Sequence, residues 1–146
     1  MLVRLYDLPD ETSRLAALHG AGIEVRRALA PERHVVVSWV RQQFGDGWAS
    51  ECEVGFARLP ISCFRAQRGQ EVLGFACYDT TAKAFFGPTG VLERERRQGI
   101  GTALLLLTLR AMAVSQGMHP LREQATRLVT QDITTIAEVM RSIYTL

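Results

Sequence analysis

The sequence predicts an α/β fold of the α+β kind, in which a mixed, mostly antiparallel sheet is flanked by helices and followed by an atypical helical tail. Three observations predict it. Apolar residues make up 47% of the 146 residues and charged residues 22%, which suits one globular domain with a real core. Periodic segments alternate between strand and helix patterns. A basic turn with two glycines joins the last strand to the helix that follows it.

The first part of the chain alternates short strands and helices. Gly20 and Gly22 interrupt one helical segment, and residues 23–28 then alternate apolar and polar side chains, as a half-buried strand does. Pro31 suits the first turn of a helix, because its missing N–H is not needed there. The predicted elements are an edge strand over 2–8, a helix over 9–18, a strand over 23–28, and helices over 31–44 and 48–58.

Three strands and a helix follow. Arg68-Gly69-Gln70 suits a hairpin turn between the first two of these strands. The predicted elements are strands over 61–66, 72–79 and 84–91 and a helix over about 99–115. We expect a single domain over 1–146, in which 1–115 form the core and 116–146 form the tail.

The most informative segment is Arg94-Glu95-Arg96-Arg97-Gln98-Gly99-Ile100-Gly101-Thr102, which leads directly into an apolar helix. Glycine lets the backbone approach a ligand closely because it has no Cβ atom. The first N–H groups of a helix have no intrahelical partner, and the helix dipole makes that end electropositive. The segment therefore predicts a site for a phosphate-bearing cofactor.

Two other phosphate motifs do not fit. A dinucleotide fingerprint requires a third glycine where this chain has Leu104. A P-loop ends in Gly-Lys-Ser/Thr, but the only lysine, Lys83, lies far from the turn. The remaining pattern is Arg-x-x-Gly-x-Gly at Arg96, Gly99 and Gly101.

This pattern resembles the pyrophosphate-binding motif of the GNAT family of N-acetyltransferases, and the continuation Gly-Ile-Gly-Thr-Ala-Leu-Leu strengthens the resemblance. The order of elements over about 1–115 is also the order of the GNAT fold. Within the family, the Trp-Ala-Ser-Glu-Cys-Glu-Val segment at 48–54 and the Gly-Phe-Ala-Cys-Tyr-Asp segment at 74–79 are similar to those of small bacterial members. The resemblance implies direct transfer of an acetyl group from acetyl-CoA, the co-substrate, to the amine of a small molecule or peptide.

The resemblance also implies which residues bind the cofactor. In the family a backbone N–H of the fourth strand polarises the thioester carbonyl, which corresponds here to Gly90, Val91 or Leu92. Arg96 is expected to fix the turn, and the side chain of Arg97 either folds over the phosphates or obstructs them. The predicted cofactor-binding residues are Val91, Leu92, Arg96, Arg97, Gln98, Gly99, Ile100, Gly101 and Thr102.

The proton acceptor is harder to assign from the sequence. Glu51 and Asp79 are the candidate catalytic bases, because the helix that carries Glu51 would border the acceptor cleft and Asp79 ends a strand. Both side chains also suit ordinary exposed carboxylates. Cys52 is not needed as a nucleophile in direct transfer.

The tail departs from the family pattern. Between residues 117 and 130 there is no alternating apolar run of strand length, and Thr134 or Thr135 followed by Glu138 predicts a helix start. Residues 120–146 resemble the C-terminal end of type II secretion and type IV pilus assembly ATPases. Without the family's fifth strand and its thiolate-protonating tyrosine, we expect weak turnover but better preserved cofactor binding. A chimera, a truncated gene and a degenerate family member all stay open.

The cysteine content indicates the compartment of the protein, and the net charge limits the kinds of partner to expect. Cys52, Cys63 and Cys77 are predicted to be buried, reduced thiols, and no zinc site can be assembled from them and three scattered histidines. No segment resembles a signal peptide or a membrane span, so a cytoplasmic location is expected. A net charge of +2 gives no reason to expect nucleic acid. A homodimer is one option for its assembly.

Two further functions remain open besides the acetyltransferase. The chain could be a module that binds acyl-CoA with little or no turnover, because its C-terminal elements are replaced. It could also be a protein-interaction module that uses the helical tail. Acetyl-CoA binding would separate the first two functions from the third, and thiol release with amines would separate the first two from each other.

Overall fold

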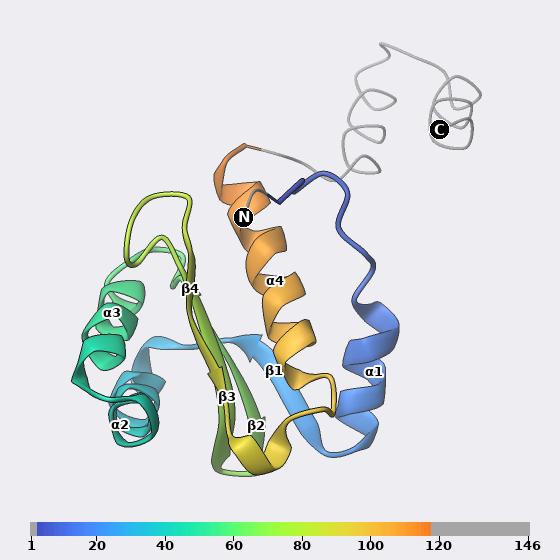
Figure 1. The fold of residues 1–146 in the computed structure, drawn as a ribbon, viewed down its shortest axis with the longest axis horizontal. Helices are drawn as coiled ribbons and strands as arrows, with labels where there is room; N and C mark the ends of the chain where they lie inside the picture. Colours follow the sequence, from blue (N-terminus) through green and yellow to red (C-terminus); the bar gives the residue numbers. More distant parts are fainter. Residues whose placement is uncertain (1–2, 118–146) are drawn as a thin grey trace. The chain divides into compact units, whose positions relative to one another are not determined.

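The computed structural model describes residues 3–117 (Figure 1). The chain divides into two compact units, Met1–Met112 and Ala113–Leu146, and the description below concerns the first. The predicted helical tail, its resemblance to assembly ATPases and the absence of a fifth strand all fall on residues that lie outside the described part.

The structure confirms most of the predicted elements, with boundaries moved by a few residues. They are α1 (Thr12–Gly20), β1 (Ile23–Arg27), the 3-10 turn η1 (Ala30–Glu32), α2 (Arg33–Phe44), α3 (Asp46–Phe56), β2 (Cys63–Arg68), β3 (Glu71–Tyr78), β4 (Phe86–Val91), the 3-10 turn η2 (Glu93–Glu95) and α4 (Ile100–Ser115). None of the helices within residues 3–117 is long and apolar enough to cross a membrane.

The edge strand predicted over 2–8 is wrong. Residues 3–8 form no strand, and the Asp7 N–H donates a hydrogen bond to the Arg4 carbonyl at 3.1 Å, which closes a turn. Leu5 and Leu8 pack against the core beside α1 and α4. The apolar pattern of this segment therefore reflects two leucines that anchor an irregular chain, not one face of a strand.

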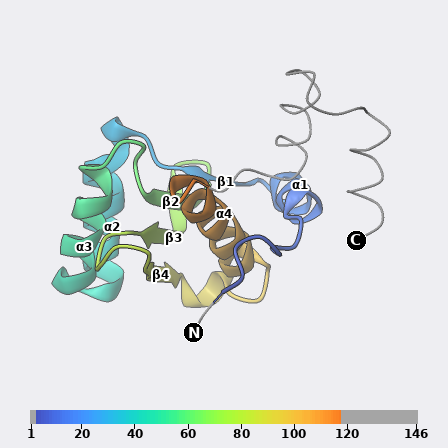
Figure 2. The same cartoon turned by 90° about the horizontal axis from the view of Figure 1, so that it is seen from above.

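The four strands form an antiparallel sheet in the order β1-β2-β3-β4, so β4 lies at one edge of the described sheet. The hairpin predicted at Arg68-Gly69-Gln70 is present, and Gly69 adopts φ +58°, which favours glycine. The helices cover both faces: α1 and α4 lie on one side of the sheet, and α2 and α3 lie on the other (Figure 2).

Each face of the sheet has its own apolar core. On the α1 and α4 side, Leu73, Ile100 and Leu104 are fully buried. On the α2 and α3 side, Val40, Cys52 and the rest of a second cluster are buried against β2 and β3. The basic turn, which contains Gly99 and Gly101, leads from β4 to the α1 and α4 side of the sheet. The turn is therefore held between β4 and the well-packed helix α4.

A carboxylate network joins η1 to the sheet. Glu32 accepts hydrogen bonds from Arg26 of β1, at 2.6 and 3.1 Å, and from Arg65 of β2, whose Nε lies 2.9 Å away. Its second oxygen also pairs with Arg65 Nη2. The guanidinium groups of Arg26 and Arg65 lower the pKa of Glu32 to about 2. Arg65 is 4% exposed, so Glu32 compensates a buried charge.

Candidate cofactor site

The basic turn connects β4 to α4 through a tight backbone path. After η2, the chain places Arg97 at φ +67° and Gly99 at φ +90°. Positive φ angles strain residues that have a side chain. Arg97 adopts such an angle although it lacks the conformational freedom of glycine. These two positions turn the chain so that α4 begins directly behind the loop.

The N-terminus of α4 presents backbone donors. The first backbone hydrogen bond across this end runs from the Ala103 N–H to the Gly99 carbonyl at 3.0 Å. Among the described residues, the N–H groups of Ile100, Gly101 and Thr102 have no backbone acceptor. Gly101 and Thr102 are exposed. Free N–H groups at the positive end of a helix dipole are suited to bind phosphate oxygens.

Three guanidinium groups at this site have no carboxylate partner among the described residues: those of Arg14, Arg96 and Arg97. Arg96 Nε donates to the Val91 carbonyl at 3.3 Å, which ties the turn to β4. Arg14 reaches over the turn from α1, since its Nη1 lies 2.9 Å from where a Cβ atom of Gly99 would be. Unpaired guanidinium groups beside free N–H groups complete a site for an anion.

The neighbouring charges are neutralised within the protein. Glu95 is 7% exposed and accepts hydrogen bonds from both terminal nitrogens of Arg68, at 3.0 and 3.2 Å. Gln98 Nε2 donates to the same carboxylate at 2.8 Å. Hydrogen bonds from Arg68 and Gln98 lower the pKa of Glu95. The side chain of Gln98 therefore supports the turn from behind and leaves its backbone N–H as the group that could face a ligand.

A depression of about 350 Å³ adjoins the turn. Its lining comes from α1 and the residue after it, with Gln98 as the residue contributed by the turn. The lining residues are Ser13, Arg14, Ala17, Leu18, Ala21 and Gln98. This depression lies beside the free N–H groups at the start of α4. The part of a ligand beyond its phosphates could therefore contact it.

The register of β4 decides which of its N–H groups are available. The Leu92 N–H donates to the Leu73 carbonyl at 2.9 Å, and the strands pair Gly90 with Phe75. Hydrogen-bonded and non-hydrogen-bonded pairs alternate along antiparallel strands, so Gly90 and Leu92 direct their N–H groups toward β3. Val91 and Thr89 direct theirs to the open edge of the described sheet. Of the three oxyanion donors expected from the sequence, the register favours Val91, and it adds Thr89.

Comparison with known proteins identifies the fold that carries this site. The Acetyltransferase (GNAT) family matches residues 29–128, which is more than half of the chain. The chain belongs to the GNAT acetyltransferase family. Membership supports acyl transfer as the general class of reaction, and members of this family generally use acetyl-CoA.

Solved structures similar to this GNAT protein share part of its chain. A candidate acetyltransferase from Pyrococcus horikoshii is 26% identical with a TM-score of 0.49, over 62% of this chain and 34% of that one. A Drosophila protein is 19% identical with a TM-score of 0.44, over 65% and 31%. An integron cassette protein of V. cholerae is 17% identical with a TM-score of 0.40, over 79% and 86%. The chain thus spans about a third of the first two, and a search of curated proteins gives no match.

The structure places Glu51 and Asp79 together at one end of the sheet. The other end carries the basic turn at residues 94–102, which we call the GNAT turn from here on. Glu51 of α3 accepts a hydrogen bond from Thr81 Oγ1 at 2.7 Å, in the loop after β3. Asp79 is 5% exposed, and its two oxygens accept from Lys83 Nζ at 3.0 Å and from the Ala84 N–H at 2.6 Å. Asp79 therefore holds the loop, whereas the other oxygen of Glu51 has no hydrogen-bond partner within residues 3–117.

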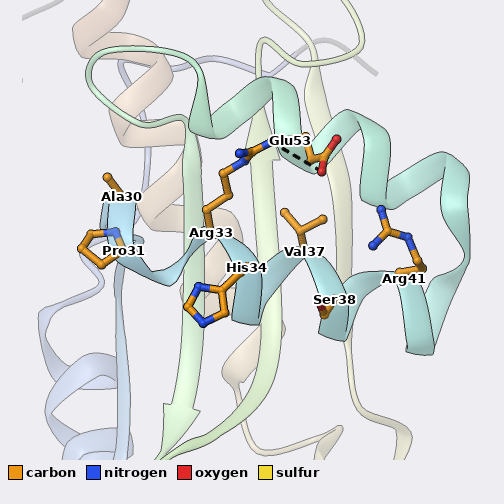
Figure 3. Close-up of a pocket in the computed structure, with 8 residues that line it drawn as sticks. All are labelled: Ala30, Pro31, Arg33, His34, Val37, Ser38, Arg41 and Glu53. Atoms are coloured by element: carbon orange, nitrogen blue, oxygen red, sulfur yellow. Dashed lines mark ion pairs between the residues drawn. The ribbon is translucent and has the colours of Figure 1, made fainter.

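A second depression, of about 520 Å³, lies on the outer side of α2 (Figure 3). Arg33 and Glu53 face each other across it at 3.6 Å, as an ion pair between α2 and α3. None of its lining residues belongs to the GNAT turn or to β4. We therefore do not assign it to the cofactor.

The three cysteines lie together, which the sequence did not indicate. Cys52, Cys63 and Cys77 are free and buried, as predicted, but their Sγ atoms all lie within 4.8 Å of one another. The expectation that no zinc site can be assembled from the cysteines and histidines considered spacing along the chain alone, whereas the fold brings the three thiols together. Hydrogen bonding to Cys63 and Cys77 lowers the pKa of Cys52, whereas hydrogen bonding to Cys52 and Cys63 raises the pKa of Cys77.

Proposed function

We propose that this GNAT protein transfers an acetyl group from acetyl-CoA to the amine of a small molecule or peptide by direct transfer. The observation that carries the proposal concerns residues 3–117: the N–H groups of Ile100–Thr102 are free there, and three guanidinium groups have no carboxylate partner in that part of the chain. Such a cluster suits the pyrophosphate of a coenzyme A thioester.

From the turn, the pantetheine arm would run along the open edge of β4. There the outward N–H groups of Val91 and Thr89 offer donors at successive positions on one side of the strand. One of them would polarise the thioester carbonyl and stabilise the oxyanion that forms when the amine attacks. The bond between carbonyl carbon and amine nitrogen forms, the carbon–sulfur bond breaks, and coenzyme A leaves as a thiolate that takes up a proton.

The acceptor would then approach from the end of β4 that lies away from the turn. Asp79 lies three residues beyond Ala76, the partner of Thr89, which is about 10 Å along the strand. This distance is too long for direct proton transfer at the thioester. We therefore assign Glu51 and Asp79 to the acceptor end of β4. There Glu51 would attract the protonated amine and take its proton before the amine reaches the thioester, and Asp79 would order the loop.

The proposal is tested by two measurements on the full chain. Equilibrium binding of acetyl-CoA should be detectable by calorimetry, and release of free coenzyme A thiol should depend on the amine in a panel of small amines and peptides. Binding without amine-dependent thiol release would favour the acyl-CoA-binding module. Absence of binding would contradict both functions.

Replacing Arg14 with glutamine should weaken acetyl-CoA binding by about tenfold, or about 1.4 kcal/mol, because one guanidinium over the turn is lost. Calorimetry measures the dissociation constant. Arg94→Gln is the matched control, since Arg94 is paired with Glu71 and lies in the same segment. Equal affinities in wild type and Arg14→Gln would remove Arg14 from the site.

Replacing Glu51 with glutamine should lower the rate of amine-dependent thiol release by about a hundredfold while leaving the acetyl-CoA dissociation constant unchanged. The reason is that Glu51 lies on the acceptor side, away from the turn. Glu53→Gln is the control on the same helix, because Glu53 faces Arg33 instead. A drop in acetyl-CoA affinity in Glu51→Gln would contradict this placement.

A further inference from the structure

The second apolar core contains a feature that acetyl transfer does not use. Cys52 of α3 lies over Cys63 and Cys77, which are direct partners on β2 and β3. The Sγ atoms of Cys52 and Cys63 are 3.9 Å apart, and the three thiols are 0% exposed. We propose that these three thiols form a binding site for a trivalent thiophilic ion of the arsenite class.

The spacing of the sulfurs fits a shared ion better than a disulfide. A disulfide requires an S–S distance of about 2.05 Å, so two of these sulfurs would have to move together by almost 2 Å. Sulfurs bonded to one ion at about 2.3 Å lie about 3.8 to 4.0 Å apart in tetrahedral or planar trigonal arrangements. In the pyramidal arrangement of arsenic(III), whose lone pair narrows the S–As–S angles, they lie about 3.4 Å apart. The Cys52 and Cys63 sulfurs, 3.9 Å apart, would have to approach by only about 0.5 Å to bind arsenic(III), and all three sulfurs lie within 4.8 Å of one another, so the required contraction is smaller than for a disulfide.

Charge selects the valence of the ion. The cluster is packed among apolar side chains such as Val40, Ala49 and Phe75. Arg65 acts electrostatically on Cys63, but its guanidinium is already paired with Glu32. A buried net charge without compensation is costly. Three thiolates would leave a charge of −2 with a monovalent ion and −1 with a divalent ion, whereas a trivalent ion gives a neutral complex.

The reaction balances without a redox step. One molecule of arsenous acid reacts with the three thiols. Three As–O bonds and three S–H bonds break, and three As–S bonds form. The three protons leave with the three hydroxyl groups as water. Because the product links α3 to both β2 and β3, binding should stabilise the fold, and because the thiols are buried, uptake should require local opening and be slow.

The test uses sodium arsenite and the reduced full chain. Native mass spectrometry should show one arsenic per chain with loss of three hydrogens, and titratable thiols should fall from three to none. The melting temperature should rise, and an excess of a small dithiol should reverse all three effects. Loss of two thiols or fewer, or binding of Zn²⁺ more tightly than arsenite, would overturn the proposal.

The variant Cys52→Ala tests whether the folded cluster is responsible. It leaves two sulfurs, so arsenite affinity should fall by about a hundredfold or more because one intramolecular ligand is lost. The affinity of wild type for arsenite in denaturant provides a second measurement that does not depend on the folding of the variant. Unchanged affinity in either case would show that the three thiols do not act as one site. Acetyl-CoA binding serves as an independent readout, because the cluster and the GNAT turn lie on opposite faces of the sheet.

Discussion

Replacing Gly101 with valine is expected to abolish the rise in melting temperature that acetyl-CoA gives the wild-type protein. Within residues 3–117, a Cβ atom at Gly101 would meet Val91 Cγ2 alone, at 3.7 Å, which is an ordinary contact. The fold should therefore accept the side chain, and valine has a better helix propensity than glycine. The added atoms would occupy the space in front of the exposed N–H groups, where the phosphates are proposed to bind.

The expected size of the rise in melting temperature follows from mass action. A ligand present at about a hundred times its dissociation constant stabilises the protein by about 2.7 kcal/mol, which corresponds to about 5 to 10 °C for a chain of this size. Thermal melts with and without acetyl-CoA measure this shift for wild type and variant.

A matched control is available in α3. Gly47 is the second residue of that helix, as Gly101 is of α4, and a Cβ atom there would meet nothing within 4 Å. Gly47→Val should therefore keep the full shift. Gly99 is unsuitable for this test, because its φ of +90° strains any side chain and Arg14 lies in the way. A folded Gly101→Val protein that keeps the wild-type shift would remove the turn as the cofactor site.

The turn could be predicted from the sequence because its chemistry is local. Gly99 and Gly101, the adjacent arginines and the apolar helix behind them are contiguous, and the structure places the helix within one residue of its expected start. The available N–H groups of β4 could not be predicted in the same way. They depend on which residues of β3 lie opposite, and a shift of one residue exchanges the inward and outward sets.

Residues that reach the site from elsewhere gave no signal in the sequence. Arg14 lies in the short helix α1, whose sequence pattern predicts only which side of the helix is apolar. The approach of Arg14 to Gly99 depends on how α1 packs on the sheet. The three cysteines are 11 and 14 residues apart, a spacing that matches no ligand motif, and the pairing of β2 with β3 brings two of them together. The strand predicted over 2–8 failed for a related reason, since alternation cannot distinguish a ladder from leucines packed on a neighbouring helix.

Replacing Glu32 with glutamine is expected to destabilise the fold by about 3 kcal/mol at neutral pH. The carboxylate joins Arg26 to Arg65, and the amide of glutamine cannot compensate the buried charge of Arg65. The pKa of Glu32 is lowered from 4.5 to about 2. A pKa difference of one corresponds to about 1.36 kcal/mol of preference for the ionised form in the folded state. Urea denaturation of both proteins measures the difference in free energy of unfolding.

The same pKa gives the pH dependence and its sign. Because the folded-state pKa of Glu32 lies below the unfolded value, its contribution to stability is fully present above about pH 4.5 and is lost as the pH falls toward 2. Glu32→Gln should therefore lose less stability than wild type over this window, and the two proteins should converge near pH 2. Glu24→Gln is the control, since Glu24 is half-exposed and contacts Arg26 at 3.4 Å without reaching Arg65; it should cost less than about 1 kcal/mol. A constant difference between wild type and Glu32→Gln from pH 7 to pH 2 would show that packing, not the charge of Glu32, determines the loss.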